Sequence, residues 1–137
     1  LTTLTAPAVI SIGEAAFLGS GLQSVSLPLA TAIGDSAFLE CLSLVEARLP
    51  SAATIGRFAF ATDGEYYGTP TLTLEFGAAA PAVPHADGVF GEEADAIITV
   101  LVPAAAVANY DAAWQNAMSG ASGFSGANSV NWTITGQ

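Results

Sequence analysis

The chain has 137 residues, of which 12 are acidic and 2 are basic, giving a formal net charge of −10. This balance, with no lysine at all, rules out simple electrostatic binding of nucleic acid and argues against an anionic membrane surface as partner, because both attract clustered basic side chains. With 52% hydrophobic and 10% charged residues, the composition is that of a folded protein, either one compact domain or one short repeat array.

Three repeat units begin the chain. Leucine recurs at intervals of 21 and 22 residues, proline falls at the same offset in each unit, and the pairs Ile-Gly and Ala-Phe follow at constant spacing. The recurring positions are Leu1, Leu22 and Leu44; Pro7, Pro28 and Pro50; Ile12-Gly13, Ile33-Gly34 and Ile55-Gly56; and Ala16-Phe17, Ala37-Phe38 and Ala59-Phe60. Columns in phase predict a repeat architecture in which each unit covers the apolar residues of the next.

The first part of each unit is predicted to be a strand. In residues 22–27, Val25 and Leu27 alternate with Ser24 and Ser26, and Pro28 ends the pattern because it has no N–H for a ladder. Stacked units of this kind predict a solenoid with a parallel sheet on one face and short irregular, 3-10 or β segments on the convex side. The expected repeat core is Leu22, Val25, Leu27, Ile33, Phe38, Leu44, Leu49, Ile55 and Phe60.

The recurrence of glycine in each Ile-Gly pair has two possible structural explanations. It supplies either a tight corner or a close approach between neighbouring units, because a residue without a Cβ permits both.

These columns resemble the BspA-like, or treponemal-type, leucine-rich repeat family. The resemblance rests on L-x-x-V-x-L-P in residues 22–28 and I-G-x2-A-F in residues 33–38, with Cys41 following, and it covers residues 1–60. The later stretch is also similar to the tail of such proteins, with a strand ending at Pro103 before Tyr110 and Trp114, although this chain has alanines and no lysine there. The resemblance implies an α/β-type leucine-rich-repeat solenoid in a secreted or cell-surface protein with a role in adhesion.

The spacing changes after the third unit. Phe60 and Leu72 are 12 residues apart, so residues 61–71 contain an inserted loop that carries Tyr66 and Tyr67. Strands are expected over residues 72–76, 97–102 and 130–135, one capping helix over 104–117 and a flexible link over 120–126. The expected organisation is one continuous domain, with regular repeats in 1–71 and divergent repeats with a C-terminal helical and strand cap in 72–137.

The residue inventory does not favour catalysis or metal binding. His85 is the only histidine and Cys41 the only cysteine, so the chain lacks the ligands of a zinc site, a disulfide pair and a recognisable nucleophile motif. The acidic residues 92–95 lack the spacing of a calcium loop and are expected to form a solvated turn, with cation binding as the alternative. Residues 96–108 are too short an apolar run to span a bilayer. We therefore expect no enzyme activity, no cofactor and no membrane insertion.

The outward face of the predicted sheet is the candidate binding surface. With the prolines as register marks, its two columns are Thr3, Ser24, Glu46, Thr73, Thr99 and Thr5, Ser26, Arg48, Glu75, Leu101. Short polar side chains suit either plain solvated strand positions or a shallow docking surface. The expected partner-binding residues are Ser24, Ser26, Glu46, Arg48, Thr73, Glu75 and, on the inserted loop, Tyr66 and Tyr67; the two tyrosines alternatively fold back over the solenoid edge.

These observations lead to an expected function. The resemblance implies a non-catalytic recognition or adhesion module, extracellular or at the cell surface, that binds a host matrix protein or another cell-surface protein. A structural spacer or end-cap of a larger surface protein is one alternative, and a glycan-binding module is another, although the columns offer no row of aromatic residues.

The first residues give two further expectations. The chain begins at Leu1 without an initiator Met or a signal segment, as a mature or excised fragment would. Leu1 and Leu4 lie on an open sheet edge, which predicts self-association of the chain through this edge.

Overall fold

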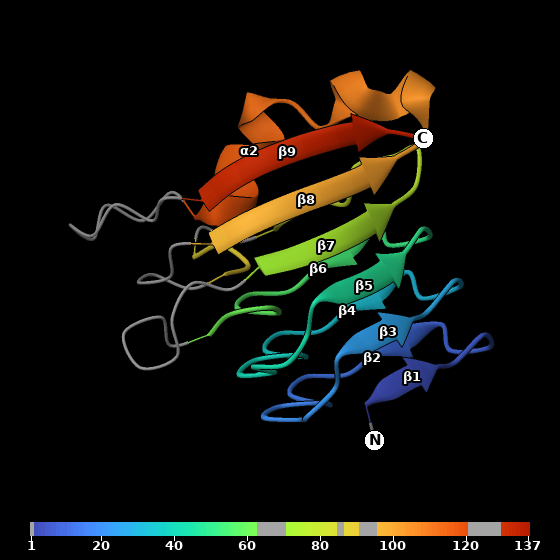
Figure 1. Ribbon diagram of the computed structural model, residues 1–137, viewed down its shortest axis with the longest axis vertical. Helices are drawn as coiled ribbons and strands as arrows, with labels where there is room; N and C mark the ends of the chain where they lie inside the picture. The colour runs from blue at the N-terminus through green and yellow to red at the C-terminus, as the bar shows by residue number, and fades with distance from the viewer. Residues whose placement is uncertain (1, 63–70, 85–86, 91–95, 121–129) are drawn as a thin grey trace.

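The chain passes repeatedly between two parallel sheets (Figure 1). The computed structural model describes residues 2–62, 71–84, 87–90, 96–120 and 130–137. The larger sheet contains Thr3–Thr5 (β1), Ser24–Ser26 (β3), Glu46–Leu49 (β5), Thr71–Phe76 (β7), Ala96–Val102 (β8) and Val130–Gly136 (β9), in that spatial order. The smaller sheet contains Ser11–Ile12 (β2), Ala32–Ile33 (β4) and Thr54–Ile55 (β6). The described structure is therefore a mostly parallel β-structure with few helices.

Side-chain alternation explains the strands of the larger sheet. In β3, buried Val25 lies between the half-buried Ser24 and Ser26, and the strand is shorter than the expected 22–27. In β7 and β8 every second residue is buried over six and seven residues respectively. Thr71, expected at the end of the inserted loop, is the first residue of β7. Residues 63–70, which include Tyr66 and Tyr67, lie outside the described residues.

The ladder register confirms the two outward columns predicted from the prolines. The first column continues from Thr99 to Thr133 and the second from Leu101 to Thr135, because β9 pairs in parallel with β8 and ends the sheet. Since Glu46 pairs with Thr73, Leu72 lies opposite Val45 and not opposite Leu44.

A left-handed residue recurs in the turns that follow the smaller sheet. Ala15, Ser36 and Phe58 occupy the same position in their units and have φ of 52°, 56° and 55°. Their N–H groups donate hydrogen bonds to backbone carbonyl oxygens of the next unit. Ala15 donates to the carbonyl of Asp35, Ser36 to that of Arg57 and Phe58 to that of Gly88, at 2.9, 2.7 and 3.0 Å. Backbone hydrogen bonds between neighbouring units therefore extend through the turns as well as the sheets.

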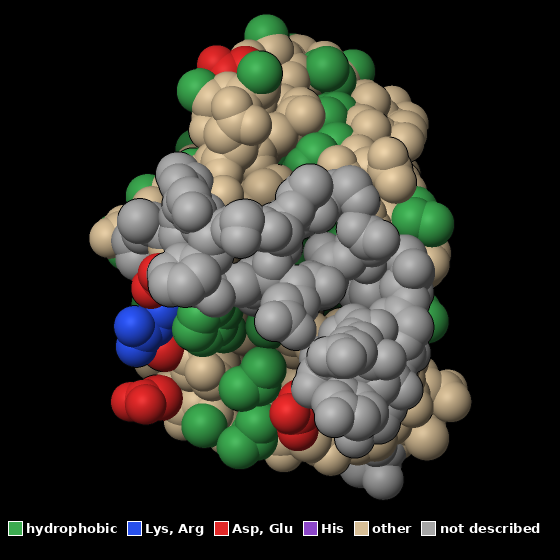
Figure 2. Space-filling model, turned by 90° about the vertical axis from the view of Figure 1, so that its left-hand side faces the viewer, with side chains coloured by type: hydrophobic (Ala, Val, Ile, Leu, Met, Phe, Trp, Pro, Cys, Tyr) green, Lys and Arg blue, Asp and Glu red, His purple; other side chains and the backbone are tan. Residues whose placement is uncertain are grey.

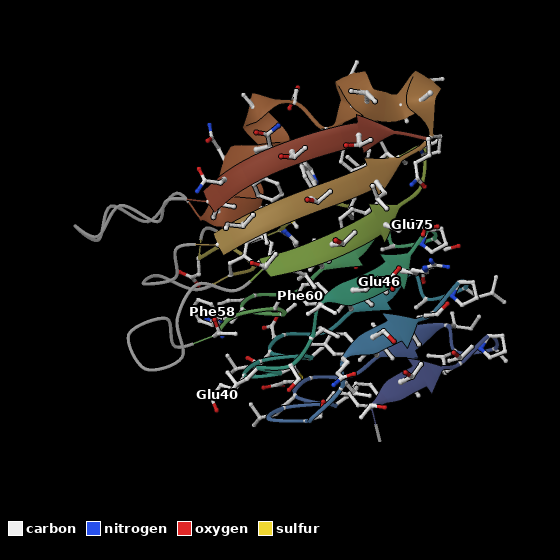
Figure 3. All side chains as sticks on the ribbon, in the orientation of Figure 1. Glu40, Glu46, Phe58, Phe60 and Glu75 are labelled. Carbon is white, nitrogen blue, oxygen red and sulfur yellow. The ribbon has the colours of Figure 1, made fainter. Side chains whose placement is uncertain are left out.

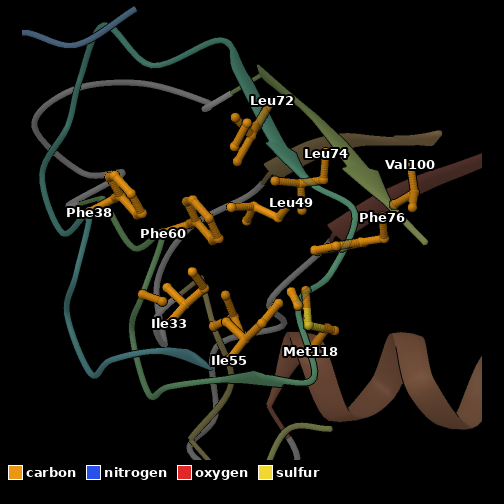
Figure 4. Close-up of a cluster of buried hydrophobic side chains, with 14 of the residues drawn as sticks. Ile33, Phe38, Leu49, Ile55, Phe60, Leu72, Leu74, Phe76, Val100 and Met118 are labelled. Atoms are coloured by element: carbon orange, nitrogen blue, oxygen red, sulfur yellow. The ribbon is translucent and has the colours of Figure 1, made fainter. Parts of the chain in front are cut away.

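The core lies between the two sheets and the turns (Figure 4). Of the nine expected repeat-core residues, Leu44 is half-buried, while eight are buried: Leu22, Val25, Leu27, Ile33, Phe38, Leu49, Ile55 and Phe60. The rings of Phe17, Phe38 and Phe60 are stacked, with 5.3 Å between successive centroids. This spacing is close to the strand separation of about 4.8 Å, so one aromatic ring per unit forms a continuous column.

The glycines of the Ile-Gly pairs permit close approach between units. A Cβ at Gly34 would lie 2.7 Å from the carbonyl carbon of Gly13, and a Cβ at Gly56 would lie 2.5 Å from that of Gly34. Neither glycine has a positive φ. The close-approach explanation is therefore confirmed, and the tight-corner alternative does not apply.

The C-terminal cap differs from the single helix expected over residues 104–117. A 3-10 helix, η1 (Ala104–Asn109), is followed by an α-helix, α2 (Ala112–Ser119). The Asp111 side chain accepts a hydrogen bond from the Trp114 N–H at 2.9 Å, so Asp111 caps a new helix instead of continuing the first one. Residues 121–126 of the link expected over 120–126 lie outside the described residues.

Candidate interaction surface

The outward face of the six-stranded sheet is uncovered by the described helices. In Figure 1 this face is turned to the viewer, the smaller sheet lies behind it, and the helices lie beside β9 at one end. The side chains on this face project toward the viewer in Figure 3. The fold therefore exposes one broad face and buries the opposite face of the same sheet.

The sequence-predicted site residues in the described ranges share this face. Ser24 and Ser26 on β3, Glu46 on β5, and Thr73 and Glu75 on β7 are half-buried by their neighbours. Arg48 on β5 is exposed. The register brings them together because Ser24, Glu46 and Thr73 share one column, and Ser26, Arg48 and Glu75 share the other. Tyr66 and Tyr67 lie outside the described residues, so the inserted loop stays a prediction.

Arg48 joins two carboxylates at the centre of the face. Its Nε lies 2.8 Å from Glu46 Oε1 and 3.5 Å from Glu75 Oε2. The hydrogen bond to Glu46 and the charges of both carboxylates raise the pKa of the Arg48 guanidinium above its usual value. Glu46 and Glu75 extend from neighbouring strands on the same side of the sheet (Figure 3). The group carries two negative charges and one positive charge. Because its side chains are solvent-exposed, it contributes little to stability and is accessible to a partner.

Hydroxyl groups surround this charged group. Ser24 Oγ donates to Thr3 Oγ1 at 3.3 Å, which links β1 to β3 on the outward face. Thr73, Thr99 and Thr133 continue the same column across β7, β8 and β9. A surface of short hydroxyl side chains presents hydrogen-bond donors and acceptors at nearly uniform height.

Part of this surface lies beyond the columns that the sequence pattern predicts. Thr133 and Thr135 extend both columns, but no proline marks the register of β9. Ile97 is 45% exposed and lies in a third outward column with Thr71 and Asn131. The position of Ile97 between the inward-facing Ala96 and Ile98 is the sequence feature that could have predicted its outward orientation.

A second ionic group lies in the turns. Arg57 lies 3.5 Å from Asp87 and 4.0 Å from Asp35, and its backbone N–H donates to Asp35 Oδ1 at 2.8 Å. The guanidinium carbon is 5.7 Å from the centre of the Phe58 ring. Acidic and basic side chains lie together on the side of the molecule drawn in Figure 2. Because the contacts of Arg57 with Asp35 and Asp87 join neighbouring turns, this group fastens the turns to one another.

Among the described residues, one cavity lies at the C-terminal ends of β5, β7 and β8, and another lies between α2 and β9. One of about 250 Å³ is lined by Glu75, Phe76 and Val102 among others, and one of about 430 Å³ is lined by Gln115, Asn116 and Trp132 among others. Glu75 is the single ionisable side chain in the two linings. A cavity with one carboxylate does not hold the pair of groups that acid and base catalysis requires.

Metal-binding side chains do not cluster in the part of the chain that the structure describes. Among residues 2–62, 71–84, 87–90, 96–120 and 130–137, no three His, Cys, Asp or Glu side chains gather as a metal site would require. Cys41 is buried, and its Sγ donates to the Phe17 oxygen at 3.0 Å and lies 3.2 Å from Ser20 Oγ. His85 and the acidic residues 92–95 lie outside the described residues. The part of the chain that the structure describes has no helix with the length and hydropathy to cross a membrane.

Comparison with known proteins identifies no relative of this chain. The sequence matches no protein-family model, and no curated protein or solved structure matches the chain. The function is therefore inferred from the outward face of the six-stranded sheet and from the repeat pattern.

Proposed function

We propose that this chain is a non-catalytic recognition module that binds a protein partner through the outward face of its six-stranded sheet. The observation that supports the proposal is the uncovered face on which two columns of mostly short polar side chains run in register across all six strands. At about 4.8 Å per strand, the columns extend over about 24 Å. This width suits a protein surface better than a single small molecule.

The proposed scaffold is a leucine-rich-repeat solenoid of the BspA-like type. Support comes from the repeat columns in the sequence, from the alternation of parallel strands between two sheets, and from turns that recur with the same left-handed residue. As the resemblance to that family implies, the module is proposed to act at the cell surface or outside the cell, with a host matrix protein or another cell-surface protein as partner. Tyr66 and Tyr67 are proposed as additional contacts, since tyrosine supplies a large and rigid contact area.

A structural end-cap is the second candidate function. It is favoured by η1 and α2, which lie against β9 at one end of the sheet; for example, the Ala104 N–H donates to the Gln137 oxygen at 3.1 Å. Glycan binding has less support, because the two outward columns contain no aromatic side chain for stacking against a sugar ring.

The test places lysines on the face. A variant with Ser24→Lys, Ser26→Lys and Glu75→Lys is compared with the wild-type chain for capture by an immobilised panel of purified matrix glycoproteins and collagens. We expect wild-type capture and loss of capture by the variant, with an unchanged melting curve. A separate variant with Tyr66→Ala and Tyr67→Ala reports on the inserted loop.

The matched control changes the charge equally at exposed positions elsewhere. It carries Glu14→Lys, Ser43→Lys and Ala53→Lys, which lie outside the outward columns. We expect this control to bind as the wild type does. Equal capture by the face variant would rule out the sheet face, and no capture by the wild type would favour the end-cap.

A further inference from the structure

The cavity of about 430 Å³ between α2 and β9, which we call the α2–β9 cavity, lies at the helical end of the six-stranded sheet (Figure 1). Its volume falls within the range of about 300–1,000 Å³ that is typical of sites for small ligands. Val130 and Trp132 line it from β9, where they pack toward the core and alternate with Asn131 and Thr133 on the outward face. The cavity therefore lies on the side of β9 opposite the outward face.

The helix supplies the polar half of the lining. Gln115, Asn116 and Ser119 all line the cavity, and they share one face of α2 because Ser119 is three and four residues from the other two. Trp114 and Met118 lie on another face of α2 and are buried in the core. The core residues fix the rotation of the helix, and this rotation directs the two amides and the hydroxyl toward β9.

The strand supplies an aromatic ring in a fixed orientation. Trp132 makes edge contacts with the rings of Phe90 and Trp114, with centroids 5.8 and 5.4 Å away and interplanar angles of 67° and 63°. Its Nε1 donates to Ser119 Oγ at 3.3 Å. Contacts from three sides hold the indole in place, so it needs no reordering when a ligand binds.

The polar side chains of the cavity keep hydrogen-bonding capacity. Gln115 Nε2 donates to the Tyr110 oxygen at 3.0 Å, and Ser119 Oγ donates to the Gln115 backbone oxygen at 2.8 Å. Within the described part of the chain, neither the Gln115 side-chain oxygen nor the Asn116 amide has a partner. Together they offer two acceptor oxygens and the two N–H donors of Asn116.

The charge of the site restricts the ligand class. Among the described residues that line the cavity, none is ionisable. The net charge of −10 opposes the approach of anions such as phosphates and acidic sugars. A neutral sugar ring has the same division as the cavity, because its hydroxyl groups both donate and accept while its C–H faces are apolar.

We propose that the α2–β9 cavity is a binding site for a neutral sugar ring. The Trp132 indole packs against a C–H face of the ring, and Gln115 and Asn116 hydrogen-bond its hydroxyl groups. This site supplies the aromatic side chain that the outward columns lack. It shares no residue with the outward face, so this proposal and the proposed function fail independently.

The test titrates the full chain with the methyl glycosides of glucose, galactose, mannose and N-acetylglucosamine, with cellobiose and lactose, and with uridine. Binding is measured by saturation-transfer NMR of the ligand protons. We expect saturable binding of at least one sugar with a Kd of about 1 mM, since a ligand of so few atoms gains limited affinity. Equal affinity for one and two rings would support a site for free sugars, and tighter binding of a disaccharide would support a site for the end of a longer glycan.

Matched variants locate the binding. Asn116 is exposed, so Asn116→Ala should keep the wild-type melting curve while weakening the Kd for the sugar by about 10-fold. Asn131→Ala removes the same amide from the outward side of β9 and should bind as the wild type does. Trp132→Phe loses the hydrogen bond to Ser119 and part of the ring surface, so it should also weaken binding; if this variant melts early, Asn116→Ala decides.

Three outcomes would overturn the proposal. They are the lack of saturable binding for every sugar in the series, equal affinity of the Asn116→Ala and Asn131→Ala variants, and tighter binding of uridine than of any sugar. Protein capture by the outward face is measured separately and does not bear on these outcomes.

Discussion

Glu40 has the same left-handed backbone conformation as Gly19, which occupies the equivalent position one unit earlier. Their φ angles are 58° and 65°. The Gly19 N–H donates to the Leu39 oxygen and the Glu40 N–H to the Ala61 oxygen, both at 2.8 Å. Hydrogen bonds to the next unit therefore hold this conformation whichever residue is present. A residue with a Cβ is strained there by about 1 kcal/mol, because its Cβ crowds the following carbonyl oxygen.

Glu40→Gly should stabilise the protein. Glycine relieves the strain but gains freedom in the unfolded chain, so we expect a net increase of about 0.5 kcal/mol in the free energy of unfolding, measured by urea titration. Glu40→Ala is the matched control, because it removes the carboxylate but keeps the Cβ. If the alanine variant is stabilised as much as the glycine variant, the cause is the lost charge and not the backbone.

Gly34→Ala should destabilise the protein by about 1–3 kcal/mol, since the new Cβ meets the backbone of Gly13 and Glu14 and not a side chain that can rotate away. The control is Gly13→Ala at the equivalent position, where a Cβ meets no described atom within 4 Å. The control should retain the wild-type urea midpoint. Equal losses in the two variants would contradict the close-approach explanation.

Phe38→Ala should cost about 3–5 kcal/mol in the free energy of unfolding. The Phe38 ring is 1% exposed and stacks on both Phe17 and Phe60. Phe17→Ala is the comparison at the end of the same column, where the ring is half-buried, and its cost should be clearly smaller. A loss of less than about 1 kcal/mol for Phe38→Ala, measured by urea or thermal unfolding, would show that the ring column does not hold the units together.

The register of the larger sheet could be predicted from the sequence because each unit repeats its own landmarks. Pro28 and Pro50 fix where the strands end, and alternation around Val25 fixes which side chains face outward. At β7 no proline ends the strand, and alternation predicts that Thr73 and Glu75 face outward. In Thr71-Leu72-Thr73-Leu74, counting leucines does not show which of two successive positions begins the unit, and the actual alignment depends on pairing with β5.

Other features depend on contacts that the sequence pattern does not contain. The helix expected over 104–117 follows from alanine-rich propensity, but the Asp111 cap and the buried Tyr110 divide it in two. The candidate surface differs from this: periodicity predicts the columns and, with them, a charge group of Glu46, Arg48 and Glu75, whereas the distances from Arg48 to the two carboxylates depend on the side-chain conformations and on the pairing of β5 with β7. Short hydroxyl side chains have no ligand-specific spacing, so they predict the location of a surface and not its partner.

Tyr110 should make the protein sensitive to alkaline pH. Its side chain is buried, its hydroxyl donates to the Gly77 oxygen at 2.7 Å and lies 3.2 Å from the Ala79 oxygen, and burial raises its pKa to about 12. An unfolded tyrosine has a pKa of about 10, so the stabilisation is fully present below pH 10 and is lost as the pH rises toward 12, by about 2 kcal/mol. The measurement is the urea midpoint at a series of alkaline pH values. Tyr110→Phe should be less stable by about 1–2 kcal/mol at neutral pH but should lose this part of the alkaline slope. An unchanged slope in the phenylalanine variant would assign the pH dependence to another group.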